Sequence, residues 1–245
     1  MADELFTCVT VGVTGDGKST TCNTLCGQDH FDTSGGLSSE TSRSSHLDYL
    51  HIGLGVVGAV EPREIRIVDT IGLHDTGLPS EEVLQRFAAF SDLVPCGINM
   101  FLFVVRWGRF KPEHEAAFDA FCANCGEAAL GNTLLAFSSC SLSPEALATE
   151  LGKHAPESLR RLLPKLVGPP VGFDSVRDRS GARAILHSAI DAAAIATEGR
   201  RYSNAALAEA RVRFDAAQEQ ERAAFAAAVS DWRKGSGPVI VEREL

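Results

Sequence analysis

The feature that most constrains how this chain can fold is a glycine-rich stretch near its start, Gly12–Ser19, which reads GVTGDGKS. It matches the pattern G-x-x-x-x-G-K-[ST] in full. A β-branched, apolar run that is typical of a buried strand, Leu5–Val13, precedes it, and a helix is expected over Lys18–Cys26. The pattern therefore has the strand–loop–helix context that a phosphate-binding loop requires.

The residue types within this stretch suit a phosphate chain and a metal ion. Its glycines let the backbone turn tightly and aim N–H groups at phosphate oxygens. Lys18 would reach the β- and γ-phosphates, the Ser19 hydroxyl would bind Mg²⁺, and the following helix would present its positive end to the same anion. We therefore expect this loop to bind a nucleoside triphosphate with Mg²⁺.

A second stretch, Ile67–Gly72 (IVDTIG), is expected to complete the metal site. Asp69 ends a hydrophobic strand and would bind Mg²⁺ through water, while the Gly72 amide would sense the γ-phosphate. Between the two stretches lies a polar segment rich in Gly, Ser and Thr, in which Thr41 is a candidate second hydroxyl ligand of the metal. The alternative is that Thr41 is one hydroxyl of a flexible loop with no ligand role.

Strands and helices are expected to alternate along most of the chain. The expected strands are Leu5–Val13, His46–Val56, Glu64–Thr70, Ile98–Arg106, Asn132–Ser138 and Val171–Phe173. The expected helices are Lys18–Cys26, Ser80–Val94, a segment that starts at Pro112 and stops at Gly126, further segments up to Leu166, and Gly181–Thr197. This alternation predicts an α/β domain over residues 1–200, with a mainly parallel central sheet flanked by helices. Ligands of such sheets bind at the carboxyl ends of the strands, where the glycine-rich loop lies.

Residues 201–245 differ in composition and are expected to form a C-terminal helical extension. From Tyr202 to Lys234 the chain is rich in Ala, Glu and Arg and contains no Gly or Pro, which predicts one long helix followed by a short tail. Its apolar residues on one narrow face are Leu207, Phe214, Phe225, Val229 and Trp232. The favoured interpretation is that this face packs against the sheet domain, and the alternative is a surface for a partner or for self-association.

Composition limits the classes of partner. The net charge of −9, from 23 basic and 32 acidic residues, argues against a general binder of nucleic acid. The seven cysteines show no disulfide-framework spacing and favour a reducing compartment. The N-terminus has no signal-peptide pattern, and no apolar run is long enough to span a bilayer. A cytoplasmic protein is expected, and membrane association is not evident.

With these residues in view, the chain resembles the AIG-type, immunity-associated GTPases, which are relatives of septins and chloroplast import GTPases. The resemblance covers about residues 5–195 and rests on GVTGDGKSTTCNTLCG, the following FDT, VDTIGLHD and, most specifically, GINMFLFVVRWGRFKPEHEAAF. It implies a P-loop NTPase fold and a GTP-binding switch that uses GTP and GDP with Mg²⁺. It also implies a homodimer that forms across the nucleotide.

The resemblance assigns roles by position. The residues expected to bind the nucleotide are Gly12, Val13, Thr14, Gly15, Asp16, Gly17, Lys18, Ser19, Thr20, Thr33, Gly72, Ser139, Ser141 and Ser175. The expected metal ligands are Ser19, Thr41 and Asp69. Leu73 stands where Ras-like enzymes place a glutamine that orients water, so unaided hydrolysis should be slow. Arg109 matches the arginine that acts across the dimer in this family, a contribution worth about 10³–10⁵ in rate. The alternative is that Arg109 is a surface arginine, since Arg106 is also available for this role.

The base-recognition positions depart from the family pattern. The aspartate expected after the LLAF strand is Ser141, and the asparagine of the later FDN motif is Ser175. Loss of a bidentate acceptor should weaken guanine preference by about 1–3 kcal/mol. Asp174 would compensate if its loop shifted toward the base.

Three functions are compatible with the sequence. The first is a slow GTPase switch assisted by dimerisation, and the second is a nucleotide-binding interaction module with little hydrolysis or relaxed base specificity. The third is a relaxed NTPase or P-loop kinase, which would need an arginine-bearing lid. The arginine cluster of the chain falls in the wrong place for such a lid and is better explained as ordinary helix and loop surface: Arg160, Arg161, Arg177, Arg179 and Arg183.

Overall fold

The computed structural model describes residues 5–33, 44–51, 63–70, 91–108 and 110–233. Several predicted features lie outside these residues. They are Thr41, Gly72, Leu73, Arg109, most of the expected helix Ser80–Val94 and the end of the expected strand His46–Val56.

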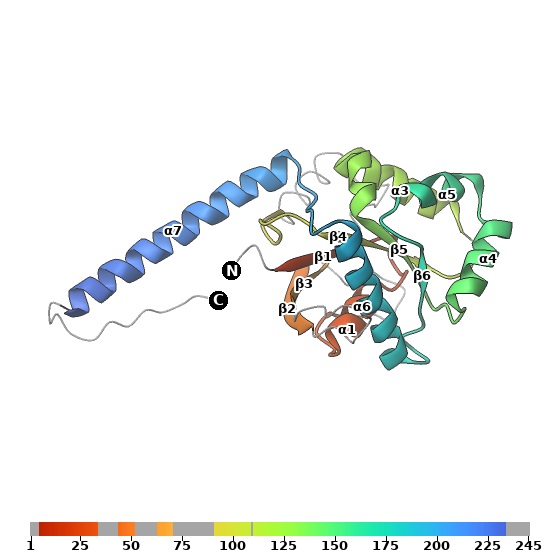
Figure 1. The fold of residues 1–245 in the computed structure, drawn as a ribbon, viewed down its shortest axis with the longest axis horizontal. Coiled ribbons are helices and arrows are strands. Elements are labelled where there is room, and N and C mark those ends of the chain that lie inside the picture. The colour runs from red at the N-terminus through yellow and green to blue at the C-terminus, as the bar shows by residue number, and fades with distance from the viewer. Residues whose placement is uncertain (1–4, 34–43, 52–62, 71–90, 109, 234–245) are drawn as a thin grey trace.

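A six-stranded sheet forms the centre of the domain, with the strand order β2-β3-β1-β4-β5-β6 (Figure 1). The strands are β1 (Phe6–Val11), β2 (Ser45–His51), β3 (Arg63–Asp69), β4 (Met100–Arg106), β5 (Thr133–Ser138) and β6 (Val171–Gly172). Only the edge strand β2 runs antiparallel to its neighbour, and the remaining pairs in this sheet are parallel. The predicted mainly parallel sheet is therefore confirmed.

Helices cover both faces of this sheet. They are α1 (Lys18–Cys26), α3 (Pro112–Cys125), α4 (Pro144–His154), α5 (Glu157–Leu162), α6 (Arg179–Ala196) and α7 (Ala205–Arg233), with short 3₁₀ turns at Glu127–Asn132 and Leu163–Lys165. The face toward α3 and α4 buries an aromatic cluster in which the rings of Phe103 and Phe118 stack at 3.7 Å. The other face packs α1 and α6 on Ile67, Met100 and neighbouring side chains.

Helix α3 begins and ends where its sequence predicts. Pro112 occupies the first turn, together with Glu113 and Glu115, and Gly126 follows the last turn with φ of 77°. Proline lacks the N–H that a first turn leaves unpaired, and glycine adopts positive φ without a steric cost. Pro112 therefore sets the start of α3, after β4 and its following loop, and Gly126 sets its end.

Helix α7 departs from the favoured expectation over most of its length. Leu207, the first residue of the predicted face, is buried against the domain together with Ala210, and Phe214 on the same face is only half-buried. Figure 1 shows the helix leading away from the sheet. Of the predicted apolar face, Leu207 therefore packs on the domain near the start of the helix, whereas the side chains of Phe225, Val229 and Trp232 lie outside the described part of the structure.

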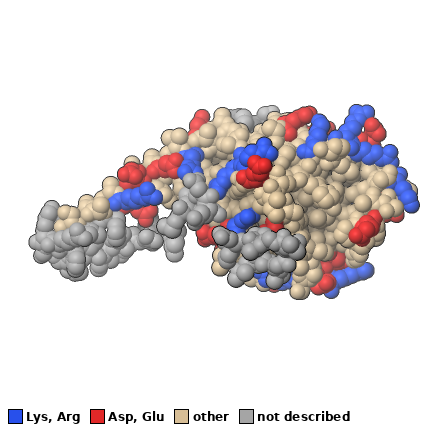
Figure 2. All heavy atoms as spheres, in the orientation of Figure 1, with Lys and Arg blue, Asp and Glu red and all other residues tan. Residues whose placement is uncertain are grey.

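The described surface carries charged side chains of both signs. Figure 2 shows acidic and basic side chains interspersed over the described part of one face. In the part of the chain that the structure describes, no helix combines the length and apolar character needed to cross a membrane.

Candidate functional site

The glycine-rich loop joins β1 to α1 at the carboxyl end of the sheet, as predicted. Gly12, Gly15 and Gly17 all have positive φ, at 138°, 88° and 96°. A Cβ on Gly12 would lie 2.3 Å from the carbonyl oxygen of Val104 in β4, so this position has no room for a side chain. The loop starts on the strand between β3 and β4, a position where doubly wound sheets bind ligands.

Lys18 is held inside this loop. Its side chain is buried, and Nζ donates to the Val13 carbonyl oxygen at 3.1 Å. Burial lowers the pKa of Lys18, while the charges of Asp69 and Asp16 oppose that effect. Among the described residues this ammonium donates to one carbonyl, which leaves it capacity for an anion, the role predicted for it toward phosphates.

Two of the predicted metal ligands come together from separate elements. Ser19 Oγ on α1 donates to Asp69 Oδ2 at the end of β3 over 2.5 Å. Burial raises the pKa of Asp69, and the hydrogen bond from Ser19 and the charge of Lys18 act against this rise. A cation at this point would favour the ionised carboxylate.

The donor set fits magnesium better than a transition metal. Among the described residues, no group of three or more His, Cys, Asp or Glu side chains could hold a metal ion. Mg²⁺ is commonly bound by one or two protein oxygens, with phosphate and water oxygens completing its octahedron. The hydroxyl of Ser19 and the carboxylate of Asp69 supply such a pair.

Asp16 occupies a different environment from the rest of the loop. Its side chain is buried and faces α3, where His114 Nε2 lies 3.1 Å from Asp16 Oδ2. Its carbonyl oxygen accepts a hydrogen bond from Ser138 Oγ at the end of β5, over 2.6 Å. The sequence predicts Asp16 at the nucleotide only as a member of the loop and gives no signal for His114, because no local pattern links residues so far apart in the chain.

The base-recognition positions bring a carboxylate beside the unexpected serine. Ser141 Oγ donates to Asp174 Oδ2 at 3.2 Å. The backbone N–H groups of Val176 and Arg177 donate to Asp174 Oδ1 at 3.2 Å, and that of Arg177 contributes most to a lowered pKa of this carboxyl. Asp174 is therefore ionised near neutral pH and lies next to the position where the family aspartate is missing. Ser139 precedes this pair at a φ of 54° and is exposed.

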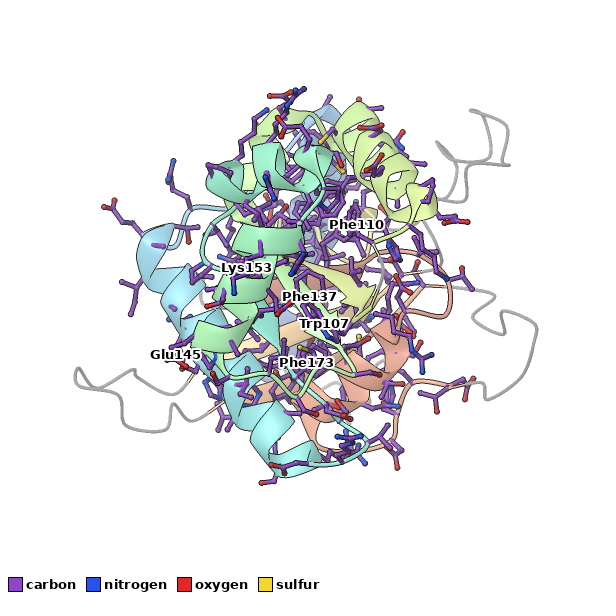
Figure 3. All side chains as sticks on the ribbon, turned by 90° about the vertical axis from the view of Figure 1, so that its right-hand side faces the viewer. Trp107, Phe110, Phe137, Glu145, Lys153 and Phe173 are labelled. Carbon is purple, nitrogen blue, oxygen red and sulfur yellow. The ribbon has the colours of Figure 1, made fainter. Side chains whose placement is uncertain are left out.

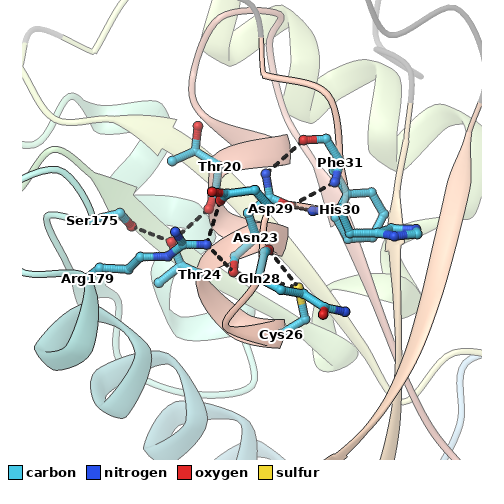
Figure 4. Close-up of polar contacts among 10 residues, drawn as sticks. All are labelled: Thr20, Asn23, Thr24, Cys26, Gln28, Asp29, His30, Phe31, Ser175 and Arg179. Carbon is cyan, nitrogen blue, oxygen red and sulfur yellow. Dashed lines mark hydrogen bonds and ion pairs between the residues drawn. The ribbon is translucent and has the colours of Figure 1, made fainter.

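Ser175 is tied to α1. Thr24 Oγ1 donates to Ser175 Oγ at 2.8 Å, which links the loop after β6 to the helix that follows the phosphate loop (Figure 4). Asn23 holds the segment after α1 by accepting the N–H groups of His30 and Phe31. Thr33, two residues further on, is exposed.

The arginines of α6 pair locally. Arg179 Nη2 donates to Asp29 Oδ1 at 2.7 Å and to the Asn23 carbonyl oxygen (Figure 4). Arg183 Nε donates to the Leu25 carbonyl oxygen at 3.1 Å. Both side chains close the C-terminal end of α1, so their contacts are those of a structural cap on that helix.

An open pocket of about 560 Å³ lies beside the end of β4. Trp107, Phe110 and Phe137 line it together with residues of α4 and α5, and the rings of Trp107 and Phe137 meet edge to face at 5.1 Å (Figure 3). The backbone N–H of Trp107 donates to the Ser138 carbonyl oxygen, so this pocket shares β5 with the base-recognition loop. Arg106, the alternative to Arg109 as the catalytic arginine, also lines it.

Comparison with known proteins identifies the family of this chain and solved structures with a similar fold. The AIG1 family matches residues 6–221 of this chain. Toc33 from Arabidopsis thaliana, solved in complex with GDP and Mg²⁺, is 21% identical, with 81% of this chain and 86% of that chain covered at a TM-score of 0.55. The same protein with Mg²⁺ and GMPPNP has 21% identity, coverage of 81% and 87% and a TM-score of 0.56. A variant of SsGBP has 15% identity, coverage of 80% and 57% and a TM-score of 0.50. The architecture is thus shared with solved GTPases, and the chain belongs to the AIG1 family.

Proposed function

We propose that this chain is a Mg²⁺-dependent GTP-binding protein and a slow GTPase switch whose hydrolysis is assisted by dimerisation across the nucleotide. The observation that carries the proposal is the contact between Ser19 and Asp69 beside the buried ammonium of Lys18. This arrangement offers two hard oxygens to a metal and one cation to phosphates, within a loop of glycines. When bound, Mg²⁺ would neutralise charge on the phosphate oxygens.

Asp174 supports guanine as the base. Guanine presents two neighbouring N–H donors on one edge, and a carboxylate can accept both, whereas adenine lacks this pair of donors. Ser141 itself provides only a hydroxyl, but it hydrogen-bonds to an ionised carboxylate from the neighbouring loop. In the proposed function, Asp174 therefore replaces the missing family aspartate.

Dimer-assisted hydrolysis is proposed from the sequence and from relatives. Leu73 has no group that could orient water, so an additional catalytic group is needed. An arginine-to-alanine mutant of Toc33 is described as dimerisation-deficient, and dimerisation is described as important for the GTPase activity of the chloroplast translocon components atToc33 and psToc159. For this chain we assign a corresponding role to Arg109, acting from one protomer on the nucleotide of its partner.

Nucleotide titration tests the binding part of the proposal. Purified protein would be titrated with fluorescent analogues of GTP and ATP in the presence of Mg²⁺. We expect preference for the guanine analogue, loss of binding in Lys18→Ala, and unchanged binding in Lys153→Ala, which changes a lysine in the last turn of α4. Equal affinity for both bases would overturn the assignment to GTP, and absence of binding would overturn the function.

The second candidate is a nucleotide-binding interaction module with little turnover, which Leu73 favours. The two functions differ in how turnover depends on protein concentration. A dimer-assisted GTPase should hydrolyse more GTP per protein molecule as concentration rises, and Arg109→Ala should remove that increase. An interaction module should show negligible turnover at every concentration while it still binds the nucleotide.

A further inference from the structure

A carboxylate inside a phosphate-binding loop repels the negatively charged phosphates of a ligand. Asp16 stands between Gly15 and Gly17, and its side chain is buried rather than directed to solvent. Its Oδ2 atom is fully buried, and no described residue forms a well-aligned hydrogen bond to it. Because buried ionised oxygens without partners are costly, the surroundings of this atom need an explanation.

His114 is the group that faces this oxygen, with Nε2 3.1 Å from Asp16 Oδ2. Its Nδ1 atom accepts the backbone N–H of Lys111, at the N-cap of α3, over 3.0 Å. The neutral ring must therefore carry its proton on Nε2, because Nδ1 needs its lone pair to accept. A second proton on this ring can go only to Nδ1, where it would displace the hydrogen bond from Lys111.

The charged and titratable groups around the pair come from three elements. Lys18 on α1 interacts electrostatically with both Asp16 and Asp69, and the thiol of Cys22 on the same helix is kept neutral by burial, which raises its pKa. On α3, the carboxylate of Glu115 accepts a hydrogen bond from Ser158 of α5. The phosphate loop and the end of β3 thus hold two carboxylates and one ammonium before any phosphate arrives.

We propose that Asp16 and His114 form a proton-linked pair that takes up a proton when a Mg²⁺–triphosphate complex binds to the loop. The bound complex adds further negative charge, which favours the imidazolium form of His114. The proton comes from solvent and binds His114 Nδ1, and the Lys111 N–H loses its acceptor at the start of α3. The proton returns to solvent when the nucleotide dissociates. This regulation rests on the proposed function, since it requires a triphosphate at the loop.

Calorimetry measures the proton directly. Titration with GMPPNP, already saturated with Mg²⁺, would be repeated at pH 6.5 in buffers of different ionisation enthalpy, because the dependence of the observed heat on that enthalpy gives the number of protons taken up. We expect the natural protein to take up more protons per bound nucleotide than Asp16→Asn and than His114→Asn do. The asparagine at 114 keeps an acceptor for the Lys111 N–H but cannot be protonated. His154→Gln is the matched control, since His154 also faces a carboxylate, that of Glu150, but on the surface of α4.

Hydrogen exchange provides a second readout that a purely structural pair would not change. The amide of Lys111 should exchange at least tenfold faster when GMPPNP is bound at pH 6.5, and Asp16→Asn should remove this change. Linkage also requires the Kd of the natural protein to rise with pH more steeply than that of Asp16→Asn, by up to tenfold per pH unit for one proton. Protons released by the ligand itself are common to all variants and cancel in the comparison.

The outcomes separate this inference from the proposed function. Binding of GMPPNP with equal proton uptake in the natural protein and in Asp16→Asn would overturn the proton-linked pair and leave nucleotide binding intact. Absence of binding in the natural protein would overturn both. Asp16→Asn is close to isosteric, and an uptake by the natural protein equal to that of His114→Asn would refute the inference independently of that variant.

Discussion

Replacement of Gly12 by alanine should be among the most destabilising single-methyl additions in this chain. The new Cβ would lie 2.3 Å from the carbonyl oxygen of Val104, which belongs to the neighbouring strand β4. Neither strand can easily move, because Val11 and Phe103 are register partners of β1 and β4 in the centre of the sheet. Positive φ with a side chain costs about 1–3 kcal/mol and forced packing about 1–3 kcal/mol more, so we expect a loss of roughly 2–6 kcal/mol.

Gly15→Ala is the matched control for this prediction. Gly15 also has positive φ, at 88°, but a Cβ there would meet nothing within 4 Å. Only the conformational cost applies, so the loss should be about 1–3 kcal/mol. Urea unfolding at pH 7 without nucleotide would give both free energies of unfolding. If the two variants differed by less than about 0.5 kcal/mol, the close approach of β1 and β4 would not be the reason that Gly12 is a glycine.

Three further predictions concern other sites. Asp174→Asn should weaken binding of a fluorescent GTP analogue by about 10–100-fold and leave the affinity for an ATP analogue unchanged, because only guanine offers the paired N–H donors. Equal effects on both affinities would refute a role of Asp174 in base selection. Burial lowers the pKa of His187 to about 4, so between pH 6.5 and 4 only the unfolded chain takes up the proton. The contribution of this neutral histidine to the free energy of unfolding should therefore be fully present above pH 6.5 and fall as the pH drops toward 4. The urea midpoint of His187→Gln should fall less over that range. Leu207→Ala should lower the free energy of unfolding by about 2–5 kcal/mol, because this buried side chain anchors α7 to the domain. Val212→Ala, at a position with 69% exposure, should change it by less than about 0.5 kcal/mol. Similar values for the two variants in calorimetry would show that Leu207 does not anchor the helix.

Much of the fold and the phosphate side of the candidate site could be predicted from local spacing. The glycines, Lys18 and Ser19 lie within one loop and one helical turn, so their relative positions follow from chain geometry. Asp69 could be added because parallel strands end at the same edge of a sheet, and the structure does bring its carboxylate into contact with Ser19. The alternation of strands and helices likewise predicted the parallel sheet, since a crossover helix is needed between parallel strands.

The remaining features were decided by tertiary structure. Ser141 and Asp174 are 33 residues apart, and their contact depends on the pairing of β5 with β6, where Phe137 lies opposite Gly172. His114 meets Asp16 because α3 packs on the sheet beside the phosphate loop.

The course of α7 shows the opposite case, in which a local pattern was interpreted too broadly. Its apolar spacing predicted packing along the face, but Leu207 is buried near the start while Phe214 on the same face is only half-buried, and the helix leads away from the sheet. A helix can form from propensity over its whole length, whereas packing needs large apolar side chains and a facing surface at each turn. The sequence by itself thus determined the secondary structure, because helices and strands depend largely on local propensity and hydrogen bonding. The tertiary structure determined which charged groups meet, because those contacts depend on long-range packing.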